Sequence, residues 1–197
     1  MGQSLELDRR AWVVQVMGLP VSVHLRGPGV RSDAVAARVE AVFAELRTVD
    51  ELFSTYRPES VIGRMAGRMP DPATADPVVG EVVGLCELAR TRTDGWFDAR
   101  RLPLPAGGPG FDPSGLVKGW AVERAARWLA DLGDHDLCLN AGGDVLLRTG
   151  PGRPAWRVAS RTGRPAAAAG RAGAALRRGG HLGHRPAAGR TSWTRAT

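Results

Sequence analysis

The sequence predicts an α+β fold in which long amphipathic helices pack against antiparallel strands. Two valine-rich segments, residues 12–17 and 20–25, are separated by Gly18-Leu19 and have the pattern of two strands joined by a tight turn. Apolar residues recur at spacings of three and four over residues 35–53 and again over 79–89, as on one face of a helix. Strand and helix patterns do not alternate regularly, which favours α+β over a β-α-β arrangement.

The first predicted helix follows a break at Gly27-Pro28-Gly29 and has Ser32 as its N-cap. It has to end before Pro58, because a residue that precedes a proline avoids the helical region. We expect its buried stripe to comprise Val35, Val39, Val42, Phe43, Leu46, Val49 and Phe53.

A second long helix is expected after a short helical turn that Ser60 caps and that runs through Met65. Asp76 is its N-cap, and Asp94-Gly95 ends it because glycine readily adopts the left-handed conformation at a helix C-terminus. We expect its buried side to carry Val79, Val82, Val83, Cys86 and Ala89.

The remaining elements follow a loop rich in Pro and Gly at residues 103–115. A third helix is predicted from about Val117 to Leu132. Short strands are predicted at Leu137–Leu139 and Val145–Leu147, and Trp156–Ala159 begins another.

Length and composition are those of one globular domain. The chain has 197 residues, of which 43% are hydrophobic and 24% charged. No apolar run approaches the ~18 residues of a membrane helix, and no secretory signal is visible at the N-terminus. Two cysteines are too few for a disulfide framework. We therefore expect a cytoplasmic protein with no membrane span.

The positive charge is concentrated in residues 160–197. This segment holds eight Arg and no Asp, Glu or Lys, so the net charge of +7 divides into +8 for the segment and −1 for residues 1–159. The body therefore gives no electrostatic reason to bind nucleic acid. With ten Ala and seven Gly, the segment is typical of a disordered tail, of a basic arm for nucleic acid or membranes, or of translation in a shifted frame. We predict an incomplete domain at 1–159 and a separate tail at 160–197.

The strongest candidate for anion binding is Asp112-Pro-Ser-Gly-Leu-Val-Lys-Gly119, which leads into the third predicted helix. Unpaired N–H groups at a helix start attract phosphate. Lys118 adds a full positive charge there and is the only lysine of the chain. Taken alone, the pattern is equally typical of a capped helix that carries a surface lysine.

The segment Asn140-Ala-Gly-Gly-Asp144 lies between two predicted strands. It has the composition of a hairpin turn, because Asn and Gly accept positive φ. The same glycines would let a ligand approach the backbone, with Asn140 and Asp144 directed at it. The segment is compatible with both interpretations.

Aromatic residues are prominent in two further segments. Thr93-Asp-Gly-Trp-Phe-Asp98 combines two aromatic rings with acids, which suits either a helix end that enters the core or a wall for a flat heterocycle. Phe53-Ser-Thr-Tyr-Arg-Pro58 contains the only tyrosine, Tyr56. The histidines have no metal-ligand spacing, and Cys86 and Cys138 have the positions of unreactive core residues.

Together and in this order, the motifs resemble those of the ApbE-type FAD:protein FMN transferases. The resemblance spans roughly residues 10–159. The five matching motifs are Met17-Gly18 between the first two strands, Phe53–Pro58, Thr93–Asp98, Asp112–Gly119 and Asn140–Asp144.

The resemblance implies Mg²⁺-dependent transfer of FMN from FAD to a Thr or Ser hydroxyl of an acceptor flavoprotein, with release of AMP. It implies Lys118, Asn140 and Asp144 as catalytic candidates and the backbone carbonyl of Val117 as a metal ligand. Ser114 and Lys118 fall on the loop near the phosphates of FAD. The other implied FAD contacts are Met17, Tyr56, Trp96, Phe97 and Asp98.

The sequence departs from the family pattern after Trp156. Family members continue to a segment in which an Asp and a nearby Thr or Ser complete the metal site, whereas residues 160–197 contain no Asp. We therefore expect a truncated or frameshifted family member that is inactive or weakly active, because Mg²⁺ requires hard oxygen ligands. The alternative is a protein that binds FAD without turnover.

Overall fold

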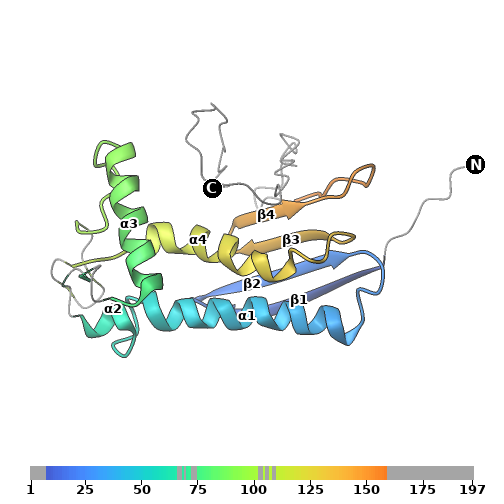
Figure 1. Ribbon diagram of the computed structural model, residues 1–197, viewed down its shortest axis with the longest axis horizontal. Helices are drawn as coiled ribbons and strands as arrows, with labels where there is room; N and C mark the ends of the chain where they lie inside the picture. The colour runs from blue at the N-terminus through green and yellow to red at the C-terminus, as the bar shows by residue number, and fades with distance from the viewer. Residues whose placement is uncertain are drawn as a thin grey trace, which may run out of the picture.

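The computed structural model describes residues 8–158 apart from residues 66, 67, 69, 72–74, 102, 103, 105, 106, 108 and 109. In this part of the chain, four antiparallel strands form one sheet in the order β1-β2-β3-β4 (Figure 1). The strands are β1 (Arg9–Val16), β2 (Leu19–Arg26), β3 (Asp136–Ala141) and β4 (Asp144–Arg148). Together with the helices, this sheet confirms the predicted α+β class.

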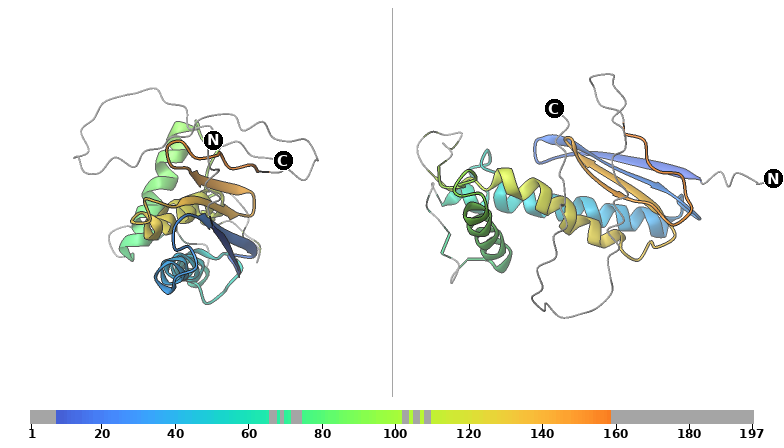
Figure 2. Two further views of the ribbon diagram at one scale, coloured as in Figure 1. Left: turned by 90° about the vertical axis from the view of Figure 1, so that its right-hand side faces the viewer. Right: turned by 90° about the horizontal axis from the view of Figure 1, so that it is seen from above.

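The helices all lie in the one long segment that separates β2 from β3. They are α1 (Asp33–Phe53), α2 (Val61–Arg64), α3 (Pro77–Arg92) and α4 (Ser114–Ala126), and the 3-10 turn η1 (Arg127–Leu129) continues α4. Figure 2 shows α1 and α4 side by side along one face of the sheet. Among the described residues, no helix combines the length and apolar character that a membrane crossing requires.

The core lies between that face of the sheet and the helices. Alternate residues of β2 and β3 point into it, as the two-residue period of a strand requires, and these are Val21, Val23, Leu25, Leu137, Leu139 and Ala141. From α1, all seven apolar residues of the predicted stripe are buried. Ser32 caps α1 by accepting a hydrogen bond from the Val35 amide, so both the start and the buried face of this helix are confirmed.

Three predicted boundaries were wrong. The third helix ends at Ala126 and continues only as the 3-10 turn to Leu129, short of the predicted Leu132. The other two boundaries differ because of hydrogen bonds and backbone geometry near the turns. The first hairpin turns at Met17-Gly18, not at Gly18-Leu19, since both residues have the positive φ of a tight two-residue turn. The third helix begins at Ser114, three residues before Val117, because the Asp112 carboxylate accepts the Ser114 amide hydrogen at 2.9 Å. Ser114 and Lys118 therefore lie within α4 and not on the loop that precedes it.

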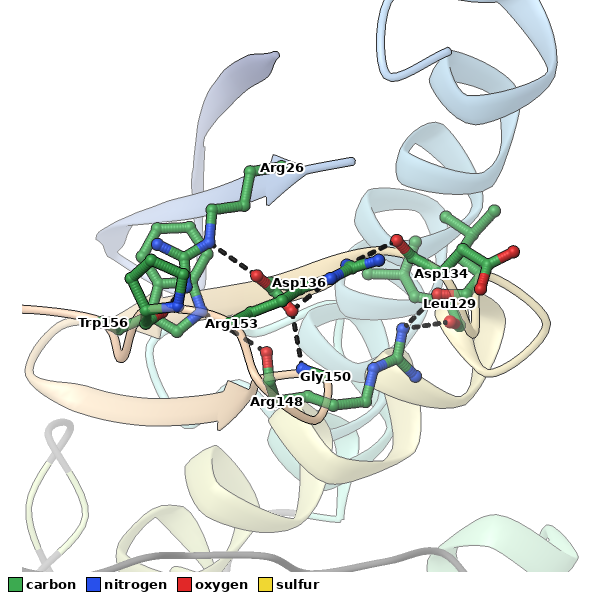
Figure 3. Close-up of polar contacts among 10 residues, drawn as sticks. Arg26, Leu129, Asp134, Asp136, Arg148, Gly150, Arg153 and Trp156 are labelled. Atoms are coloured by element: carbon green, nitrogen blue, oxygen red, sulfur yellow. Dashed lines mark hydrogen bonds and ion pairs between the residues drawn. The ribbon is translucent and has the colours of Figure 1, made fainter. Parts of the chain in front are cut away.

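The predicted strand at Trp156 is also wrong for residues 156–158, which are irregular, while Ala159 lies outside the described residues. After β4 the chain turns back, and its path is fixed by side chains of the sheet (Figure 3). The buried Asp136 carboxylate accepts the Gly150 amide hydrogen, Arg153 donates to the Asp134 carbonyl, and the Trp156 ring lies under Arg26. The Trp156 indole also donates to the carbonyl of Arg148, the last residue of β4, at 3.4 Å. The predicted tail at 160–197 lies outside the described residues.

Candidate functional site

Two of the motifs are turns at the same end of the sheet. β1 and β2 meet at Met17-Gly18, and β3 and β4 meet at Gly142-Gly143. Val21 of β2 pairs with Ala141 of β3, so antiparallel pairing brings the two turns side by side. A Cβ atom at Gly142 would lie 3.0 Å from Leu19 Cδ2, which shows how closely the second turn packs on the first. Half-buried Met17 packs on the core at this end.

The aromatic segment Thr93–Asp98 packs against the start of α4. Asp94 and Gly95 have positive φ and end α3, and the Thr93 hydroxyl oxygen accepts the Phe97 amide hydrogen at 3.0 Å. The half-buried Phe97 ring covers Gly115, where an added Cβ atom would lie 3.3 Å from the ring. The Asp112 amide donates to the Ala99 carbonyl at 2.7 Å. Two motifs that are well separated in the sequence thus become one surface.

A cavity of about 570 Å³ opens at this junction. Trp96 stands at its wall and is 94% exposed. The Asp98 side chain is mostly shielded from solvent, and its Oδ2 atom lies 3.6 Å from Arg101 Nε. The lining residues are Asp94, Gly95, Trp96, Phe97, Asp98, Arg101 and Gly115. An exposed indole beside a charged pair offers both a stacking surface and polar partners to a ligand.

The first turns of α4 provide the charged part of the site. Val117 is buried, whereas Lys118 is exposed and makes no ion pair with any described residue. Ser114 and Lys118 are four residues apart in the helix, so their side chains lie on the same face. Because an unpaired ammonium near a helix start attracts anions, this face can hold a phosphate group.

Tyr56 follows the end of α1 and is 82% exposed. The loop that carries it is braced by Ser60, whose hydroxyl donates to the Ser54 carbonyl at 2.6 Å and accepts the Gly63 amide hydrogen at 2.8 Å. The last residue of α1, Phe53, meets Trp120 of α4 edge to face, with ring centroids 5.8 Å apart. The end of α1 is thereby anchored to the helix that carries Lys118.

Asn140 and Asp144 lie on opposite faces of the sheet. Asn140 pairs with Ser22 on the face away from the helices, while Asp144 pairs with Ala141, which points into the core. The Asn140 side-chain oxygen accepts the Gly143 amide hydrogen at 3.1 Å. Asn140 therefore stabilises its own hairpin turn, and the alternation of the strand separates its side chain from that of Asp144.

The described residues do not by themselves form a Mg²⁺ site. No group of three or more His, Cys, Asp or Glu side chains lies together in this part of the chain. Val117, the metal ligand that the resemblance implies, would contribute only a backbone oxygen. Mg²⁺ bound by protein usually has carboxylate ligands, and the described residues do not offer such a set.

Arg101 was not singled out by the sequence, although it lines the cavity. The chain contains 27 lysines and arginines, so an arginine next to a Pro- and Gly-rich loop carries no local signal of its own. Its proximity to the candidate motif Thr93–Asp98, three residues away, was the one available hint.

The fold is similar to that of three solved ApbE proteins. The structure is similar to the flavin transferase ApbE from Vibrio cholerae, with a TM-score of 0.62 and 20% identity over 81% of this chain and 67% of that one. The apo form of the Pseudomonas stutzeri flavinyl transferase ApbE gives a TM-score of 0.64 and 19% identity, covering 80% of this chain and 63% of that one. The ApbE protein of Thermotoga maritima gives a TM-score of 0.62 and 16% identity, covering 77% and 62%. The chain has the ApbE-type fold.

The sequence supports the same family. Residues 101–178 match the sequence model of the ApbE family, a range that begins in the described part and runs beyond it. No curated protein matches the chain. The chain spans about two thirds of the length of these solved structures. The resemblance to the ApbE-type family is thus confirmed by a family match and by the fold.

Proposed function

We propose that this protein is a flavin transferase that binds FAD and transfers its FMN half to a Thr or Ser hydroxyl of an acceptor flavoprotein, releasing AMP. The observation that carries the proposal is the packing of Phe97 on Gly115, which joins the exposed Trp96 to the first turns of α4 and hence to Lys118. An aromatic surface and a free ammonium on one helix end suit a ligand that combines flat rings with a pyrophosphate. The ApbE-type fold supports the same ligand class.

In this proposal each group has a separate task. Trp96 and Tyr56 offer exposed ring surfaces to the flat parts of FAD, and Asp98 offers a carboxylate acceptor. Lys118 and the start of α4 bind the pyrophosphate and stabilise the negative charge that develops on the departing AMP. The acceptor oxygen forms a new bond to the phosphorus of FMN, the bond from that phosphorus to the bridging oxygen breaks with its electron pair staying on AMP, and the proton of the hydroxyl is released to water.

Mg²⁺ dependence is part of the proposal because the resemblance implies it. The metal would supply further positive charge to the pyrophosphate oxygens. Since the described residues hold no cluster of carboxylates, the roles given above to Lys118 and Trp96 do not depend on the metal.

The test is incubation of the protein with FAD, Mg²⁺ and an apo-flavoprotein that normally carries FMN on a Thr. We expect flavin fluorescence that stays with the acceptor on a denaturing gel, together with an equal amount of AMP. Acceptor whose target Thr is replaced by Val is the control. Absence of both products while FAD binds tightly would contradict the transferase and favour the second candidate.

That second candidate is an FAD-binding protein without turnover. It is favoured by the lack of a metal-ligand cluster among the described residues. It predicts tight FAD binding, no release of AMP, and weaker binding in Tyr56→Ala, whose side chain is exposed and so contributes little to folding. Isothermal titration with FAD distinguishes this candidate from a protein that does not bind flavin.

A further inference from the structure

Arg124 of α4 forms ion pairs with two other helices. Its guanidinium pairs with Glu45 of α1, and its Nη1 lies 3.7 Å from Glu81 Oε2 of α3. Trp128, one turn further along the chain, donates its indole hydrogen to Glu45 at 3.2 Å. Burial raises the pKa of Glu45, but hydrogen bonds from Arg124 and Trp128 and the charge of Arg124 outweigh it and lower this pKa below 4.5. Glu45 is therefore ionised and holds α4 against α1.

Trp120 joins the same helices by a different set of contacts. Its indole N–H donates to Glu81 Oε1 at 3.0 Å, which links α4 to α3. Its ring and that of Phe53, the last residue of α1, meet edge to face at an interplanar angle of 79°. The Arg124 guanidinium lies 5.4 Å from the ring centroid. One side chain thus contacts all three helices.

Each of these helices leads directly to one part of the candidate site. α1 ends at Phe53 and continues into the loop with Tyr56, and α3 ends before the Thr93–Asp98 segment. Trp120 is two residues beyond Lys118 in α4. Any change in the angle between α3 and α4 at Glu81 would therefore move Trp96 relative to Lys118.

We propose that Trp120 and Glu81 are positioning residues that set the distance between the aromatic segment Thr93–Asp98 and Lys118. The inference rests on the proposed FAD binding. Neither residue lines the cavity, so both act through the orientation of α3 against α4. The effect on ligand binding is large because a bound FAD has to contact both sides at once.

If these residues only stabilised the fold, replacing them would lower the free energy of unfolding and leave FAD affinity unchanged. Glu81 has a side chain that is 44% exposed, and exposed ion pairs contribute little to the free energy of unfolding. Loss of its contacts should then leave stability nearly unchanged. If the residues position the site, ligand affinity falls although stability does not.

The experiment compares Trp120→Phe, Glu81→Ala and the double variant. Trp120→Phe removes the indole donor and keeps a ring against Phe53, while Glu81→Ala removes the acceptor of that hydrogen bond and the charge that faces Arg124. Asp131→Asn is the matched control, because Asp131 forms an exposed ion pair with Arg38 of α1 away from the cavity. FAD affinity is measured by quenching of flavin fluorescence, and stability by urea unfolding.

We expect each single variant to bind FAD roughly three- to ten-fold more weakly, in line with the loss of one hydrogen bond. The double variant should bind FAD no more weakly than the single variant with the larger loss of affinity. Both changes break the same hydrogen bond between Trp120 and Glu81. The urea midpoint of the Glu81 variant should match that of Asp131→Asn, because both side chains are largely exposed. Unchanged FAD affinity in both single variants, or losses that simply add, would overturn the proposal.

Hydrogen exchange without FAD separates this inference from the proposed function. Faster amide exchange over residues 93–98 in Trp120→Phe, but not in Asp131→Asn, supports positioning even if the wild-type protein does not bind FAD. Unchanged exchange in that segment would contradict positioning. Failure of the wild-type protein to bind FAD would contradict the proposed function alone.

Discussion

Arg26 Nε lies 2.6 Å from Asp136 Oδ2, and this ion pair joins two strands whose residues are far apart in the sequence. Asp136 is fully buried and also accepts hydrogen bonds from the Gly150 amide at 2.7 Å and from Arg153 Nη1 at 3.4 Å. Arg26 in turn donates to the Pro154 carbonyl and lies over the Trp156 ring at 4.4 Å. One carboxylate thereby fastens the segment after β4 to the sheet (Figure 3).

Asp136→Asn should destabilise the protein by about 3 kcal/mol or more, because it leaves the partly buried Arg26 without its counter-charge. Urea unfolding followed by circular dichroism measures the change. Asp131→Asn is the control, since its partner Arg38 is exposed and we expect a change within about 0.5 kcal/mol. Equal effects of the two substitutions would contradict the structural role of Asp136.

Stability should fall in acid. Burial raises the pKa of Asp136, but the Gly150 amide and Arg26, aided by the charge of Arg153, lower it below 3.8 overall. A depressed folded-state pKa contributes stability above the unfolded-state value of 3.8, and this stability is lost as the pH falls through the folded-state pKa. Urea midpoints measured from pH 6 to pH 2 should therefore drop below about pH 4. In Asp136→Asn the drop should be smaller, and an unchanged profile would exclude Asp136 as its cause.

Lys118→Gln should weaken FAD binding about ten-fold or more, because the pyrophosphate loses a direct charge partner. Its effect on folding should stay within about 0.5 kcal/mol, since the side chain is exposed and makes no ion pair with a described residue. Lys118→Arg retains the charge and should recover part of the affinity. Titration at low and high salt checks the origin of the effect, because the difference between wild type and Lys118→Gln should shrink as salt rises.

Cys86 should resist thiol reagents in the folded protein. Burial, and then the charge of Asp112, raises the pKa of its thiol to about 11, so the reactive thiolate is scarce near neutral pH. Mass spectrometry after treatment with iodoacetamide at pH 8 should find Cys86 unmodified until urea unfolds the chain. Rapid modification in the native state would show that α3 opens readily. The cysteine prediction from sequence is supported by this burial.

The sequence by itself determined the elements whose causes are local. The stripe of α1, the caps Ser32, Ser60 and Asp76, and the glycine after α3 follow from spacing and backbone preference within a few residues, and the structure contains each of them. The five motifs could likewise be recognised from their residues and from their order along the chain. Their shared surface could not, because it depends on which segments meet.

Only the tertiary structure decided how these segments meet. It packed Phe97 on Gly115, brought the two hairpin turns to one end of the sheet, and put Asn140 and Asp144 on opposite faces. It also buried Asp136, which has no local mark in the sequence because its partner Arg26 is 110 residues away. Local hydrogen bonds and periodicity fix each element, whereas contacts between distant residues depend on the free energy of packing the whole chain, which short sequence patterns do not encode.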